Sequence, residues 1–248
     1  MTYAYRSWRR QWGDERGCGG ALLWQMNDCW PGISWAIVDY FQRPKPAYYA
    51  VSRVLKPLAI GVQREHHDWS VAHAEPSKTS KYSLWVSSSL QEGVSGTVEM
   101  RFISVTTGRE IRERFLRRNI RIACNGTTGI IVDDTIDHTM YPEPHVLAAR
   151  LWVDDRIAAR DADWPQPFKY LDLPDRGLEI ESSSSKTAGH QQLAIRARKP
   201  VKGLVFEQRD GVTVSDSYMD IIPGDEQNVV VTGLAGPLAY RFLGQNSR

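Results

Sequence analysis

The sequence predicts a mainly β protein that begins with a short α/β segment. Over residues 1–56, apolar side chains recur at helical spacing on both sides of one short apolar run. From residue 57 onward, apolar and polar residues alternate with a period of two, which is typical of antiparallel strands. The 248 residues are 24% charged and 42% hydrophobic, so the chain has the composition of a globular protein and room for two or three small domains.

The first expected elements are a helix and a buried strand. Tyr5, Trp8 and Trp12 fall on one face of a helix within residues 1–12. The apolar run 21–24 follows a glycine-rich approach, and its length and composition are those of a buried parallel strand.

A loop and a second helix complete the α/β segment. Pro46 stands where a helix begins, and Pro57 stands where it must end. The apolar stripe of this helix comprises Ala47, Ala50, Val51, Val54, Leu55 and Leu58. One and a half α/β units cannot close a sheet, so we expect the segment to need partners outside this sequence. Alone, it would expose Trp8, Trp12, Leu55 and Leu58, and the isolated chain should then aggregate or dimerise.

Two sets of alternating strands are expected after the helix. The first set lies at 82–87, 98–103, 120–122 and 147–153, and the second at 193–195, 203–206, 218–222, 229–231 and 238–242. The proline-interrupted stretch 161–167 separates the two sets, and 182–185 is expected to be an exposed loop. We therefore expect two antiparallel β-sandwich domains, with a boundary near residue 167.

Charge and cysteine content exclude several classes of protein. The net charge of +2 gives no field that would attract nucleic acid or an acidic membrane, and the basic run 112–121 is interpreted as a solvated strand face. Cys18, Cys29 and Cys124 form no disulfide framework. No apolar stretch approaches the ~20 residues of a membrane span. The first residues lack a secretion signal, so an intracellular location is expected, although secretion stays open.

The densest group of candidate binding residues is the loop 24–35, which directly follows the expected strand. In parallel α/β barrels, the loops after the strands build the active site. The indole of Trp24 offers a flat apolar platform for a sugar ring, and Asn27 and Asp28 can hydrogen-bond to sugar hydroxyls.

This region resembles the β-mannosidases of glycoside hydrolase family 2. The segment GALLWQMNDCWPGISWAIVDY at 20–40 is similar to their eighth barrel strand and the loop after it, and RPKPAYY at 43–49 continues the likeness into the eighth helix. Segments similar to the fungal β-mannosidase B branch are REHHDWSV (64–71), EPHVLAARLWV (143–153), DWPQPFKYL (163–171) and VSDSY (214–218) with Pro223-Gly224.

The resemblance implies that the chain is the carboxyl-terminal portion of a five-domain enzyme. Residues 1–56 would be the end of a (β/α)8 barrel, from its seventh helix through its eighth strand and helix. Residues 57–167 and 168–248 would be two immunoglobulin-like β-sandwiches. The complete enzyme would release terminal, non-reducing β-D-mannose with retention, and would need no metal or organic cofactor.

The same resemblance implies which functional residues this chain carries. Both catalytic glutamates of the family lie on the fourth and seventh barrel strands, upstream of residue 1, so no catalytic residue is expected here and the isolated chain should be inactive. Trp24, Asn27, Asp28 and Trp30 are the expected substrate-binding residues, although the last three could equally hold the loop together. The expected partners are a β-mannoside or manno-oligosaccharide and the remainder of the enzyme, with no nucleic acid or membrane.

Two alternatives from other classes stay open. A sandwich could bind carbohydrate as a non-catalytic module, through aromatic platforms formed by Trp69, Trp85, Trp152 and Trp164. The chain could also be a structural remnant of a truncated enzyme.

Several other candidate sites have simpler explanations. Glu15 should lie at the wrong end of a barrel for catalysis, and Asp39 is interpreted as structural. His66, His67, Asp68 and the nearby His73 could suggest a metal, but adjacent strand residues point to opposite faces, so no metal site is expected. Cys29 has no histidine partner at a fixed spacing, and Asn125-Gly126-Thr127 is better explained as a turn than as a glycosylation site.

Overall fold

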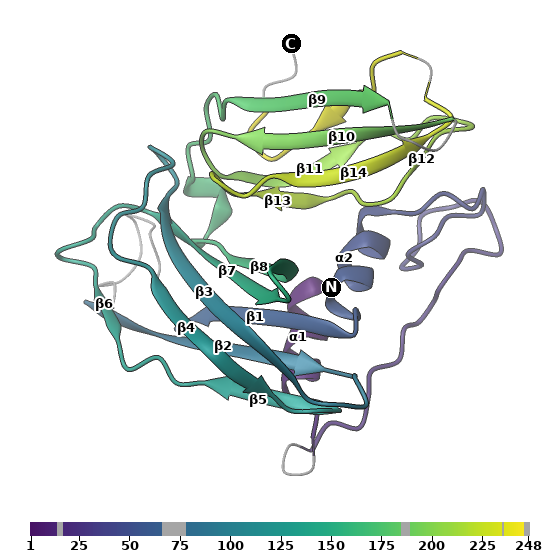
Figure 1. Cartoon of the computed structure of the whole chain (residues 1–248). Helices are drawn as coiled ribbons and strands as arrows, with labels where there is room; N and C mark the ends of the chain where they lie inside the picture. Colours follow the sequence, from purple (N-terminus) through teal and green to yellow (C-terminus); the bar gives the residue numbers. More distant parts are fainter. Residues whose placement is uncertain (14–16, 66–77, 185–188, 235, 246–248) are drawn as a thin grey trace. The chain divides into compact units, whose positions relative to one another are not determined.

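A computed structural model describes the chain as two compact units of mainly β structure (Figure 1). The first unit combines residues 1–22 with 53–171, and the second combines 23–52 with 172–248. The described residues are 1–13, 17–65, 78–184, 189–234 and 236–245.

The first unit is an antiparallel β-sandwich. One sheet has the strand order β1-β2-β5, with β6 paired to β2, and the other has the order β4-β3-β7-β8. The strands are β1 (Leu58–Arg64), β2 (Thr79–Ser88), β3 (Val94–Ser104), β4 (Phe115–Ile122), β5 (Gly126–Ile130), β6 (Thr135–Asp137), β7 (His145–Val153) and β8 (Arg156–Asp163), followed by the 3-10 helix η1 (Phe168–Tyr170). This sandwich confirms the antiparallel fold expected from the period-two pattern.

The core of the first unit follows from side-chain alternation. Leu84 and Val86 of β2 face Met100 and Phe102 of β3 across the sandwich, and all four side chains are buried. The residues between them point outward. Trp85 points outward and is nevertheless only 2% exposed, so the outer face of this sheet is also covered.

Helix α1 (Thr2–Arg10) lies against that outer face. Its carboxyl end is held by two hydroxyl groups, because Ser87 Oγ and Thr127 Oγ1 donate to the Arg9 carbonyl at 3.2 and 3.1 Å. The guanidinium of Arg10 stacks on the Trp85 ring at 4.4 Å. The helix expected within residues 1–12 is therefore confirmed.

The second unit contains two small sheets and the segment 23–52. The sheets have the orders β12-β14-β10-β9 and β13-β11-β15, and they enclose a separate apolar core. Their strands are β9 (Leu178–Ser184), β10 (His190–Ala197), β11 (Val201–Phe206), β12 (Thr213–Val214), β13 (Met219–Ile221), β14 (Gln227–Thr232) and β15 (Tyr240–Arg241). Helix α2 (Pro46–Val54) begins at the proline that the sequence marked as its start.

Two expectations about local structure are wrong. Residues 21–24 form no strand, and Leu22 is 98% exposed. A parallel strand takes its hydrogen bonds from neighbouring strands, and none of the strands among the described residues pairs with 21–24. The expected loop at 182–185 is, through Ser184, the end of edge strand β9, paired with β10. An edge strand whose side chains stay in solvent needs no apolar alternation, so its polar sequence resembled a loop.

Candidate functional site

The candidate site is the segment 24–45 of the second unit, which folds back on itself around Val38. Val38 forms a parallel bridge with Asn27 and an antiparallel bridge with Pro44. The Asp28 N–H donates to the Val38 carbonyl, and the Val38 N–H donates to the Met26 carbonyl, both at 3.0 Å. The peptide bond between Trp24 and Gln25 is cis. The loop thus has ordered backbone pairing, although the strand expected before it is absent.

Asp28 is the polar centre of this loop. It is only 8% exposed, and its carboxylate accepts hydrogen bonds from Ser34 Oγ and from Lys45 Nζ, the latter at 3.0 Å. Ser34 Oγ in turn accepts from the Ala36 N–H at 3.0 Å. The hydrogen bonds from Ser34 and Lys45 lower the pKa of Asp28 below its ordinary value. The contacts of Asp28 therefore join the two ends of the loop.

The other three predicted binding residues lie on the surface of the segment. Trp24 is 74% exposed and Trp30 is 77% exposed, while the Asn27 amide donates a 3.4 Å hydrogen bond to the Asp28 carbonyl. Further exposed apolar side chains of this region are Leu22, Met26, Ile33, Trp35, Tyr40 and Phe41. Exposed apolar surface of this extent is typical of an interface or a ligand-binding wall.

Helix α1 also presents an apolar hollow within the first unit. The hollow has a volume of about 220 Å³ and is lined by Tyr5, Trp8, Trp12 and Leu55, among others. Trp8 and Leu55 are about half exposed. The exposure predicted for the α/β segment is therefore confirmed for these two side chains. It is wrong for Leu58, which begins β1 instead of continuing the second helix and packs against the sandwich core.

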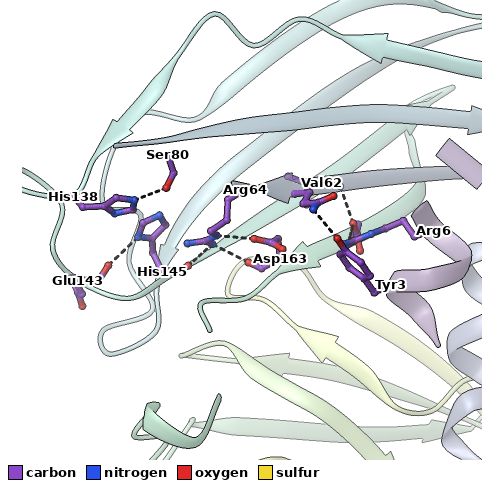
Figure 2. Close-up of polar contacts among 11 residues, drawn as sticks. Tyr3, Arg6, Val62, Arg64, Ser80, His138, Glu143, His145 and Asp163 are labelled. Carbon is purple, nitrogen blue, oxygen red and sulfur yellow. Dashed lines mark hydrogen bonds and ion pairs between the residues drawn. The ribbon is translucent and has the colours of Figure 1, made fainter. Parts of the chain in front are cut away.

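The first unit contains a buried polar junction that the sequence did not predict (Figure 2). Arg6 of α1 pairs with Asp161 of β8, which also accepts the Val62 N–H at 2.8 Å. Two residues further along β8, Asp163 accepts from Arg64 Nε at 2.7 Å. Burial raises the pKa of Asp161, whereas Arg6 and the Val62 N–H act to lower it.

The histidines beside this junction make structural contacts. His138 Nε2 lies 2.9 Å from Ser80 Oγ, and His145 Nδ1 lies 2.9 Å from the Glu143 carbonyl oxygen (Figure 2). Within the part of the chain that the structure describes, no group of three metal-ligating side chains comes together. The candidates His66, His67, Asp68 and His73 lie outside the described residues, as do Glu15 and Trp69.

Other candidate residues have definite places. The Asp39 carboxylate accepts hydrogen bonds from the backbone N–H and the Nε–H of Arg43, at 2.8 and 2.9 Å, and so stabilises a turn. Asn125 has a left-handed backbone and lies in the turn between β4 and β5, as expected. Trp85 and Trp164 are 2% and 3% exposed, so neither can be the sugar platform that the carbohydrate-binding alternative requires.

Two further observations concern the cysteines and the helices. All three cysteines, Cys18, Cys29 and Cys124, have free thiols. Among the described residues, no helix has the length and apolar character that crossing a membrane requires.

Comparison with known protein families defines the class of the first unit. The family model of the Mannosidase Ig/CBM-like domain matches residues 80–170, which include β3, β7 and β8 in full. The sandwich is thus an immunoglobulin-like domain of the kind found in mannosidases.

Individual relatives make the assignment more specific. The chain is 68% identical over 248 residues to β-mannosidase B of Aspergillus terreus and 65% identical to that of Aspergillus fumigatus. Each match covers 99% of this chain and 29% of the relative, so the chain spans less than a third of the relatives' length. Over nearly its whole length, the chain is therefore similar to the carboxyl-terminal portion of fungal β-mannosidase B.

Solved structures share the fold at lower identity. The β-D-mannosidase of Dictyoglomus thermophilum superposes with a TM-score of 0.77 and 19% identity, over 98% of this chain and 28% of that one. An exo-chitosanase of Amycolatopsis orientalis superposes with a TM-score of 0.67 and 15% identity, over 93% of this chain and 30% of that one. At this level of identity, the likeness concerns the fold alone.

Proposed function

We propose that this chain is the carboxyl-terminal part of a retaining exo-β-mannosidase that hydrolyses terminal, non-reducing β-D-mannosides. The observation that carries the proposal is the 68% identity to a fungal β-mannosidase B over 99% of the chain, including the candidate site. Retention requires two carboxyl groups about 5–5.5 Å apart. In this proposal both belong to the upstream part of the barrel, and the present chain supplies none.

Residues 1–56 are, in this proposal, the last unit of the catalytic barrel. The exposure of Leu22 and the missing strand at 21–24 support it, because a barrel strand without neighbours has neither hydrogen-bond partners nor cover for its apolar side chains. The hollow beside α1 supports it too, since Trp8 and Leu55 would be covered by the preceding barrel elements.

The loop 24–35 forms one wall of the sugar pocket in the complete enzyme. Trp24 provides the apolar platform beneath the sugar ring in the cleavage subsite, and Asn27 and Trp30 line the same wall. Asp28 is largely occupied by Ser34 and Lys45, so we assign it the task of holding the wall in shape.

Activity is tested in a chimera in which this chain replaces the matching segment of the Aspergillus terreus β-mannosidase B. We expect the chimera to hydrolyse p-nitrophenyl β-D-mannoside with release of the β-anomer, and the isolated chain to be inactive. A folded chimera without activity would contradict the proposal. Turnover by the isolated chain would show that its chemistry does not come from upstream glutamates.

The role of Trp24 is tested by Trp24→Ala in the same chimera. Loss of the platform should lower kcat/KM by about two orders of magnitude, because stacking and orientation of the sugar are lost together. Phe41→Ala is the matched control, since Phe41 is also an exposed aromatic residue of this segment, at 62% exposure. Unchanged kinetics for Trp24→Ala would remove this residue from the site.

A further inference from the structure

The sandwich of the first unit is built to receive helix α1 on the outer face of its β1-β2-β5 sheet. Trp85 and Ser87 point away from the sandwich core, yet both are only 2% exposed. Gly61, paired with Trp85 in the β1–β2 register, has no side chain and leaves room for the indole. An outward tryptophan that is buried in this way implies that the helix is a fixed part of the domain surface.

Arginine side chains fix the carboxyl end of the helix. The Arg10 guanidinium lies over the Trp85 ring, at 4.4 Å from its centroid. The Arg9 guanidinium donates to the carbonyls of Val54 and Lys56, and to that of Pro57 at 3.1 Å. These carbonyls lie at and beyond the carboxyl end of α2, where a helix has no internal donors left. Arg9 thereby ties α1 to residues 54–57 within the first unit.

The contact of Arg6 with Asp161 is the deepest of these attachments. The Arg6 side chain is 9% exposed, and the Asp161 side chain is 12% exposed. The Asp161 carboxylate also accepts the Val62 N–H at 2.8 Å, so one side chain connects β8, β1 and α1. Figure 2 shows Arg6 beside Val62 at this junction. A side chain with three such attachments sets where the helix lies along the sandwich.

We propose that Asp161 and Arg6 are positioning residues through which the sandwich holds α1, the seventh barrel helix of the proposed function, in the place that turnover by the complete enzyme requires. The inference rests on the proposed function. In the proposed function α1 is a helix of the catalytic barrel, so its place affects how the barrel strand that follows it in the chain can pair. A displacement of a binding group by about 1 Å can reduce turnover about a hundredfold.

Asp161→Asn in the A. terreus chimera tests this inference. Asparagine keeps the shape and can still accept the Val62 N–H, but it removes the charge that holds Arg6. We expect kcat to fall by about tenfold or more with a smaller change in KM. We also expect amide hydrogen exchange to become faster in α1.

Asp163→Asn is the matched control. Asp163 lies on the same strand and pairs with Arg64 of β1, at 2.7 Å, and none of its recorded bonds reaches α1. This variant should lower Tm to a similar degree while leaving kcat and the exchange of α1 unchanged, at a temperature where all variants are folded. Equal kinetic effects of the two variants would mean that Asp161 acts only through stability.

The two proposals fail in different ways. If the unmutated chimera is folded but inactive, the proposed function is contradicted, and the exchange of α1 in Asp161→Asn alone decides whether the helix is held by this contact. If the chimera is active and Asp161→Asn keeps both its kcat and the protection of α1, the inference is overturned while the proposed function stands.

Discussion

Gly61 lies directly against the indole of Trp85: a Cβ at position 61 would be 2.3 Å from Cε2 and Cζ2 of that ring. The two residues are paired across β1 and β2, and the ring fills the space that the missing side chain leaves. Gly61 does not have a left-handed backbone, so its backbone conformation alone would allow another residue. The close approach of the Trp85 ring is what requires glycine at this position.

Gly61→Ala should therefore destabilise the first unit. The added methyl group would force the Trp85 ring from its place beneath α1, at a cost of about 1–3 kcal/mol in the free energy of unfolding. Urea unfolding followed by tryptophan fluorescence measures the change. Gly19→Ala is the control, because no atom lies within 4 Å of a Cβ at that position. Equal stability of the Gly61→Ala and Gly19→Ala variants would refute the packing argument.

Arg6→Met should lower stability in a pH-dependent way. Without Arg6 the buried Asp161 carboxylate loses its counter-ion, which at neutral pH should cost about 3 kcal/mol. Burial already raises the pKa of Asp161, and loss of Arg6 raises it further. A carboxyl group whose pKa is raised in the folded state binds its proton more tightly when folded. The destabilisation is thus complete above the raised pKa and shrinks as pH falls toward the ordinary value of about 3.9.

Unfolding curves of wild type and Arg6→Met at about pH 7.5 and about pH 5 check this sign. The double variant Arg6→Met with Asp161→Asn serves as control, since it lacks the carboxyl group of residue 161 and its loss of stability relative to wild type should not diminish toward acid pH. A deficit of Arg6→Met that stays constant or grows toward pH 5 would rule out Asp161 as the titrating group.

The isolated chain should self-associate. Leu22 and Ile33 are almost completely exposed, and Trp24 and Trp30 are about three-quarters exposed, so association would remove apolar surface from water. Light scattering over a concentration series should show dimers or larger species, and Leu22→Ser combined with Ile33→Ser should reduce them. Leu116→Ser, an exposed leucine of β4, should change little. A monodisperse wild-type monomer at all concentrations would contradict this expectation.

The sequence predicted those elements whose formation depends on local pattern. Both helices, and strands such as β2, β3 and β7, show clear helical or period-two spacing, and each has an apolar face that needs a core. Strand β8 was missed because charged residues make up half of Arg156–Asp163 and the apolar residues do not alternate regularly with them. A turn signal precedes it, since Asp154 and Asp155 both have left-handed backbones between β7 and β8, as a two-residue hairpin turn requires.

The candidate site was only partly visible in the sequence. Asp28 was noted as a possible structural residue, and its contacts with Ser34 and Lys45 agree with that role. The pairing of Arg6 with Asp161 joins residues 155 positions apart, and no local pattern encodes such a contact. The strand expected at 21–24 is absent, and none of the strands among the described residues pairs with this segment. In the proposed function its neighbours would belong to the upstream part of a barrel, so its pairing could not be predicted from this sequence.

The intact mass of the native polypeptide that contains this sequence, measured by mass spectrometry after purification from its source, tests the central claim most directly. The chain matches 29% of the length of its fungal relatives, so the account predicts a species several times heavier than 28.2 kDa. A native species of 28.2 kDa, with no larger form containing the sequence, would leave no place for the two catalytic glutamates and would contradict its role as part of a β-mannosidase.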